Sequence, residues 1–149
     1  MENDNFLNRG PYDISELLVL SGDVTSELLY GSEGQRGFAD YCTVFSDGQI
    51  NLNVAPLHVL ELLPGLDTAG LAARIEQDRK ENPLTSFQDV QKLPGASPRT
   101  STLLTNIATF KSRYFMMNIQ CISSEGEDGT SFSIIFDRTI RRVVRWEES

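Results

Sequence analysis

Apolar residues in the stretch 50–95 recur at helical spacing, and this pattern is interrupted twice by the same three residues, Leu-Pro-Gly. Several leucines precede the first interruption, and Leu71 and Ile75 follow it, four apart and therefore on one helix face. Asn82-Pro83 ends this helix, because a residue before proline avoids the helical region. The pattern predicts a helical module over residues 50–111, built from two helical hairpins.

The Leu-Pro-Gly sequences are predicted to form the turns of these hairpins. Glycine adopts the left-handed conformation that closes a helix, and Asp67 and Ser97 are suitable acceptors for the free amides of the next helix. Ser86 with Asp89 three residues later predicts another capped start, and Pro98 suits the first helical position. The residues assigned to the two turns are Pro64, Gly65, Asp67, Pro94, Gly95 and Ser97.

The segment before the module, residues 1–49, is predicted to contain two short helices and a first strand. Apolar residues recur at helical spacing on both sides of Ser21-Gly22, which would join the two helices. Residues 40–46 are rich in aromatic and β-branched side chains, a composition typical of a strand.

The character of the chain changes after the module, in residues 112–149. Apolar and polar residues alternate in three runs, 113–123, 131–137 and 141–146, which predicts an antiparallel β-meander. Phe115, Met117 and Ile119 share one face of it, and this apolar face needs cover from a helix or from the helical module. We also expect the meander to pack with residues 40–46. The predicted fold class is α+β.

The charge balance argues against nucleic acid as the main ligand. The 149 residues contain 13 Lys and Arg against 21 Asp and Glu, a net charge of -8, and no segment is strongly basic. No apolar run approaches the roughly 20 residues of a membrane-spanning helix, and the first residues lack a signal-peptide pattern. We therefore expect the chain as given to be soluble.

Candidate catalytic chemistry is sparse, and we expect no enzymatic activity. His58 is the only histidine, and no nucleophile motif accompanies it. Cys42 and Cys121 lie far apart in the sequence, and whether they form a disulfide or remain two thiols is left open.

No cofactor is expected, and calcium is the only metal that the sequence leaves open. Glu125, Glu127 and Asp128 lie between glycines and form a weak candidate site. Calcium prefers about six to eight oxygen ligands, and these three carboxylates lack the spacing of a known calcium loop. A solvated hairpin turn is the alternative interpretation.

The paired helices around Leu-Pro-Gly resemble the helix-hairpin-helix motif, in which backbone amides bind phosphates. That motif commonly has a second glycine two residues after the first, where this chain has Asp67, a carboxylate that repels phosphate. The second turn also lacks this second glycine and offers only Arg99 as a phosphate ligand. A helix-hairpin-helix nucleic-acid-binding module is thus the alternative function.

Several motifs, in order, resemble the minor pseudopilin family known as general secretion pathway protein K of type II secretion systems. The matching segments cover nearly all of residues 11–148 and read PYDISELLVLSGDVTSELLYG, TVFSDGQINLNVAPLHVLELLPG, ARIEQDR, SFQDV, SRYF and RRVVRWEE. The resemblance implies a pilin-like antiparallel sheet that carries a helical insert.

The same resemblance implies a periplasmic, non-enzymatic role in protein export. Family members form the tip of the pseudopilus with other minor pseudopilins and are anchored in the inner membrane by an N-terminal apolar helix. This chain has no such helix, so it resembles a periplasmic fragment of the full-length protein. Calcium sites are associated with this class of proteins, but the resemblance assigns no ligands here, and no nucleic-acid partner is expected.

Overall fold

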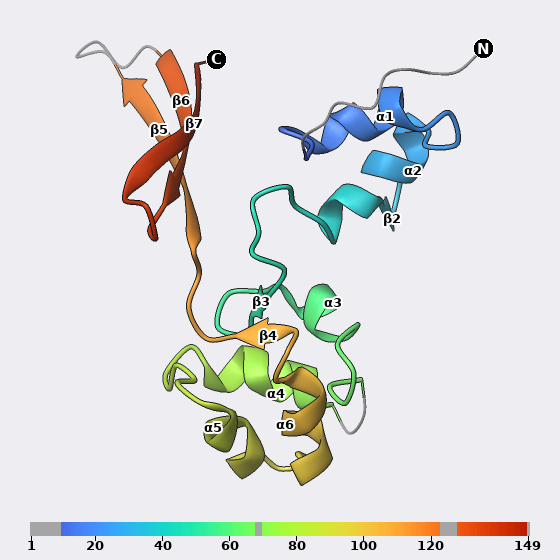
Figure 1. Ribbon diagram of the computed structural model, residues 1–149, viewed down its shortest axis with the longest axis vertical. Coiled ribbons are helices and arrows are strands. Elements are labelled where there is room, and N and C mark those ends of the chain that lie inside the picture. Colours follow the sequence, from blue (N-terminus) through green and yellow to red (C-terminus); the bar gives the residue numbers. More distant parts are fainter. Residues whose placement is uncertain (1–9, 68–69, 123–127, 149) are drawn as a thin grey trace. The chain divides into compact units, whose positions relative to one another are not determined.

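The computed structural model describes residues 10–67, 70–122 and 128–148. The described residues form both helices and strands, and two of the three sheets are antiparallel, an α+β composition as predicted (Figure 1). The chain divides into two compact units, Met1–Ser46 and Asp47–Ser149. The units are therefore described one at a time.

The first unit contains the two predicted short helices. Its elements, in order, are η1 (Ile14–Glu16), α1 (Leu17–Leu20), α2 (Ser26–Tyr30), β1 (Gly31–Ser32), β2 (Gln35–Arg36) and η2 (Phe38–Asp40). Asp13 caps the first turn by accepting a hydrogen bond from the Ser15 amide at 2.9 Å, and Thr25 accepts from the Leu28 amide at 3.1 Å to cap α2.

The predicted strand at residues 40–46 is wrong, since this stretch begins in η2 and continues as turn and irregular chain. The amide of Asp40 donates to the Gly37 carbonyl at 3.1 Å, and that of Tyr41 to Phe38 at 3.0 Å. The Asp40 carboxylate also accepts from the Gly37 amide at 2.9 Å. These local bonds use groups that a sheet ladder needs, so the β-meander has no strand here to pack with.

The second unit begins with the helical module, and both predicted hairpins are confirmed. Its elements are β3 (Ile50–Asn51), α3 (Leu57–Leu60), α4 (Leu71–Asp78), α5 (Phe87–Lys92), α6 (Pro98–Leu104) and β4 (Ala108–Thr109). Helix α3 pairs with α4, and α5 with α6 (Figure 1). The buried core between them contains Leu52, Ala55, Leu60, Leu63, Leu66, Leu71, Ala72, Ile75, Leu84, Val90, Leu104 and Ala108.

Two of the predicted helix starts are confirmed and one is wrong. Ser97 accepts a hydrogen bond from the Thr100 amide at 3.2 Å, with Pro98 at the first helical position. The Asp89 carboxylate accepts from the Ser86 amide at 3.1 Å. Asp67, in contrast, does not cap α4, because Gly70 occupies the capping position with a φ of 65°. The helix thus begins at Leu71, beyond the reach of a cap at position 67.

The two ends of the module lie side by side. Strands β3 and β4 pair in parallel, with Ile50 opposite Ala108 and Asn51 opposite Thr109. The Ile50 amide donates to the Ile107 carbonyl, and the Leu52 amide to the Thr109 carbonyl, both at 2.9 Å. The module is therefore a closed insert whose entry and exit are adjacent.

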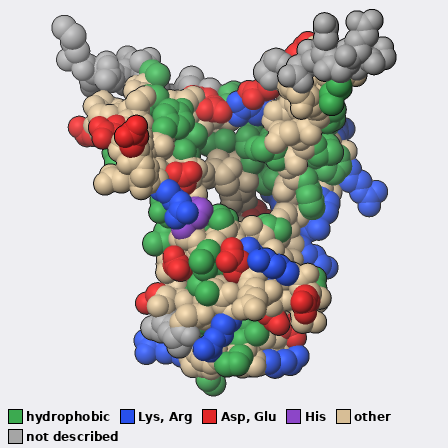
Figure 2. All heavy atoms as spheres, turned by 180° about the vertical axis from the view of Figure 1, so that it is seen from behind, with side chains coloured by type: hydrophobic (Ala, Val, Ile, Leu, Met, Phe, Trp, Pro, Cys, Tyr) green, Lys and Arg blue, Asp and Glu red, His purple; other side chains and the backbone are tan. Residues whose placement is uncertain are grey.

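The remainder of the second unit is the predicted antiparallel meander. It consists of β5 (Tyr114–Ile122), β6 (Asp128–Asp137) and β7 (Arg142–Glu148), with β6 in the centre. Phe115, Met117 and Ile119 remain 44, 45 and 46% exposed. Hydrophobic side chains accordingly gather on the surface of the sheet in Figure 2. The expected cover by the helical module is absent in the described part of this unit.

Candidate functional site

The two Leu-Pro-Gly turns share one backbone geometry. Gly65 has a φ of 82° and Gly95 a φ of 92°, in the left-handed region where glycine is favoured. In each turn the residue after glycine donates its amide to the carbonyl of the leucine, from Leu66 to Leu63 and from Ala96 to Leu93, both at 3.0 Å. Proline followed by a left-handed glycine, with this bond, is the arrangement of a type II turn.

These hydrogen bonds occupy one backbone amide in each turn. A phosphate site needs backbone amides that are unpaired and accessible, and the amides of Leu66 and Ala96 are already paired. The Gly65 corner also faces α6, since a side-chain carbon on Gly65 would lie 3.4 Å from Thr100, which is buried. The first turn is therefore a packed corner of the module.

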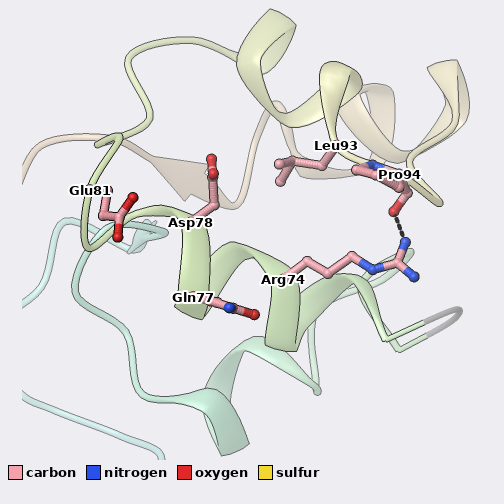
Figure 3. A pocket seen from close by; sticks show the side chains of 6 residues that line it. All are labelled: Arg74, Gln77, Asp78, Glu81, Leu93 and Pro94. Atoms are coloured by element: carbon pink, nitrogen blue, oxygen red, sulfur yellow. Dashed lines mark hydrogen bonds between the residues drawn. The ribbon is translucent and has the colours of Figure 1, made fainter.

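The charged side chains near the turns are of both signs. Asp67 and Arg99 are both exposed, one at each turn. The Arg74 guanidinium extends from α4 to the second turn and donates a hydrogen bond to the Pro94 carbonyl, as Figure 3 shows. This bond joins the first hairpin to the second.

Arg74 lines a pocket of about 310 Å³ at this junction. The other lining residues are Gln77, Asp78, Glu81, Leu93 and Pro94 (Figure 3). The pocket is lined by two carboxylates and one guanidinium, and the guanidinium already donates to a carbonyl, so the net negative charge does not suit a phosphate. A site for a polynucleotide would instead be lined mainly by lysine and arginine.

A second hollow of about 450 Å³ lies beside α5 and includes Asp78, Asp89 and Lys92. Lys92 donates to Asp89 at 2.8 Å, and this bond, with those from Thr85, holds the pKa of Asp89 well below its usual value. Because the pair is exposed, it contributes little to stability. Lys92 thus pairs with the acidic residue of the capping box of its own helix.

The described residues offer no grouping of three or more His, Cys, Asp or Glu side chains able to hold a metal ion. Of the calcium candidates, Glu125 and Glu127 lie outside the described residues, and Asp128 is the first residue of β6. His58 lies half-buried on α3. Cys42 and Cys121 are free thiols at exposed positions.

The side chains of Asn53 and Arg79 make polar contacts that close the module, and the sequence did not predict them. The Asn53 side chain accepts a hydrogen bond from the Leu84 amide and donates to the Leu84 carbonyl, both at 2.8 Å, and it also donates to the Phe110 carbonyl at 3.1 Å. Arg79 donates to the carbonyls of Leu52 and Ala55 at 2.8 and 2.6 Å. Helix α4 and the two ends of the module are thereby tied together.

A second such contact lies at the start of the sheet. Arg113 donates from Nε and Nη2 to one oxygen of Asp137, at 3.0 and 2.8 Å, and the other oxygen accepts from the Thr139 amide at 2.8 Å. Asp137 is 1% exposed. The hydrogen bond from Arg113 is the main reason why the pKa of Asp137 lies below its usual value and that of Arg113 above it.

The sequence does contain a signal for these contacts, because they fall in the segments quoted for the resemblance. Asn53 lies in QINLNVAP, Arg79 ends ARIEQDR, and Arg113 belongs to SRYF. Their partners, however, come from distant parts of the chain, up to 57 residues away for Asn53.

Comparison with known proteins gave no match to a family model, to a curated protein or to a solved structure. Within the described residues, no helix has both the length and the apolar character to cross a membrane.

Proposed function

We propose that this chain is the periplasmic part of a minor pseudopilin of the general secretion pathway protein K type. In this role it is not an enzyme. It joins other minor pseudopilins at the tip of the pseudopilus and supports the export of folded proteins across the outer membrane. The sheet of β5–β7 is the proposed pilin-like scaffold, and the helical module is its insert.

The observation that best supports this proposal is that residues of the quoted motifs make hydrogen bonds that stabilise the fold. Asn53, Arg79 and Arg113 each come from a different quoted segment, and each makes hydrogen bonds between distant parts of the second unit. Asp89, from a fourth segment, accepts the hydrogen bond that opens α5. Residues that maintain a fold are expected to recur among proteins that share it. The ordered motifs therefore favour a shared scaffold.

The surface of the scaffold also suits an assembly role. Trp146 on β7 is 63% exposed and packs edge-on against Phe132, with ring centroids 5.6 Å apart. Ile134 pairs with Trp146 across the strands, so these side chains extend the apolar face of Phe115 and Met117. Apolar patches of this kind mark sites of protein interaction, and tryptophan is a frequent anchor within them.

The proposal is tested by mixing the chain with two candidate minor pseudopilins of the same secretion system and measuring the mass of the product by light scattering. We expect a stable heteromer at micromolar concentration. Trp146→Glu should weaken it at least about tenfold, as loss of an interface anchor does. Asn106→Glu, at an exposed position of the helical module, is the matched control and should leave it intact. Failure of the wild-type chain to form any heteromer would refute the proposal.

A further inference from the structure

The turn between β6 and β7 exposes three arginines. Asp137 pairs with Arg142 across the two strands, so residues 138–141 form the turn. Arg138, Arg141 and Arg142, named here the turn arginines, are all exposed. Their backbones lie within about 14 Å of one another, because at most four residues separate them. The three long side chains are therefore able to reach one ligand.

The turn arginines differ from the other two arginines beside the sheet. Arg113 pairs with Asp137, and Arg145 pairs with Glu147. In the part of the chain that the structure describes, no carboxylate lies within ion-pair distance of the turn arginines. Their positive charge is therefore available to a ligand.

The backbone of the turn is held by hydrogen bonds from beneath. The Asp137 carboxylate, which is 1% exposed, accepts from the amides of Thr139 and Ile140 at 2.8 and 3.4 Å. The Arg138 amide donates to the Arg113 carbonyl at 2.9 Å. A ligand thus meets a preformed turn, and binding does not have to order this backbone first.

Arg141 has a backbone conformation that favours glycine. Its φ is 55°, and no other non-glycine residue among those described has a positive φ. Glycine or asparagine would relieve the strain of this conformation. Because the side chain of Arg141 is exposed and has no ion pair, the fold itself gives no reason for an arginine here. Strained residues of this kind cluster at functional sites.

The surroundings of the turn favour a short acidic protein segment as the ligand. Arginine binds carboxylates through two parallel hydrogen bonds. Ile140 and Val143 are 52 and 53% exposed beside the arginines and offer apolar contacts to such a segment. The net charge of the chain is -8, so an extended anionic surface, such as a membrane, would be repelled by the rest of the protein. A segment that is acidic only where it meets the turn avoids this repulsion.

We propose that the β6–β7 turn is a docking site for an acidic segment of a partner protein, whose carboxylates pair with the turn arginines. This inference rests on the turn alone and does not depend on the proposed role in secretion. Trp146, the anchor of the proposed heteromer, is not part of this site, so different variants test the two proposals.

The first test measures the fluorescence anisotropy of a labelled peptide of four Glu-Leu repeats, titrated with the intact 149-residue chain at about 20 mM salt. We expect saturable binding with a dissociation constant below about 1 mM, weakened about threefold or more at about 200 mM salt. The same peptide with glutamine in place of glutamate should not bind. Failure to bind the acidic peptide, or equal binding of both peptides, would overturn the proposal.

The second test separates binding from folding. Arg141→Gly should raise the melting temperature by about 2 °C or more, because glycine relieves the strain, and should raise the dissociation constant about threefold or more. Arg99→Gln removes the same charge at an exposed position of the helical module and is the matched control, with binding unchanged. Unchanged binding in Arg141→Gly, or an equal loss in Arg99→Gln, would overturn the proposal.

A third measurement distinguishes an acidic protein segment from an anionic lipid surface. In sedimentation with phosphatidylglycerol vesicles at the same low salt, the chain should stay in solution, because its net charge opposes binding. Cosedimentation that is lost in Arg141→Gly would show that the turn binds a lipid surface and would overturn the proposal.

Discussion

The side chain of Asn53 pairs with the backbone of Leu84 in the way that a neighbouring strand would. Its Oδ1 accepts from the Leu84 amide and its Nδ2 donates to the Leu84 carbonyl, both at 2.8 Å, across 31 residues of sequence. Leu84 is 3% exposed, so no water replaces these bonds. One amide side chain thus fixes the segment that connects the two hairpins.

Asn53→Ala should lower the free energy of unfolding of the second unit by about 2–3 kcal/mol. The substitution removes three hydrogen bonds and leaves a buried amide without a partner. Urea unfolding followed by circular dichroism measures the change. Asn106→Ala, at an exposed position, should stay within about 0.5 kcal/mol of the wild type. Equal effects of the two substitutions would show that Asn53 does not hold the module together.

The pair of Arg113 and Asp137 should make stability depend on pH. The pKa of Asp137 is lowered in the folded state, chiefly by Arg113, so its contribution is present above the unfolded value of about 3.9 and is lost as pH falls below it. Asp137→Asn should lower the urea midpoint at pH 7 and flatten its fall between about pH 5 and 2. Asp67→Asn, at an exposed position, should keep the wild-type profile.

Ser97→Ala should cost about 1 kcal/mol of stability. The Ser97 hydroxyl accepts from the Thr100 amide at 3.2 Å and is the cap of α6. Ser97→Gly should cost only a few tenths of a kcal/mol, because glycine is also accepted at this position. Thermal unfolding of the two variants under the same conditions gives the comparison, and a larger loss for glycine than for alanine would contradict the assignment of the cap.

The proposed role at the pseudopilus tip gives the helical module a further test. In that role we expect its bulk to prevent further subunits from stacking above it. Because Asn51 lies opposite Thr109, residues 54–108 are replaceable by a short Gly-Ser link. In a secreting cell, the shortened full-length protein should then incorporate along the pseudopilus, as located by immunogold labelling. Confinement of the shortened protein to the tip would rule out the steric explanation.

Much of the fold was predictable because it is encoded locally. Helical spacing, the capping residues Ser86 and Ser97, and the alternation in β5–β7 each act within a few residues, and the structure contains all of them. The two local errors also have local causes. Asp40 binds its own turn instead of joining a strand, and Gly70 takes the capping position expected for Asp67.

The contacts of Asn53, Arg79 and Asp137 were not predictable in the same way. Their partners lie 24 to 57 residues away, and nothing in the composition of the intervening chain specifies which groups meet. The geometry of the candidate site was predictable only in part. The carboxylate of Asp67 in the sequence was enough to predict that the first turn does not bind phosphate. The hydrogen bond from the Leu66 amide to the Leu63 carbonyl became visible only in the structure.

The central claim is that the two Leu-Pro-Gly turns are corners of a closed scaffold and not a phosphate-binding surface. Its most direct test is a titration of the chain against a fluorescent DNA duplex at about 50 mM and 200 mM salt. The account predicts no salt-sensitive binding, and no difference between the wild type and Arg99→Ala. Binding that weakens by orders of magnitude over this range, and is lost in Arg99→Ala, would contradict it.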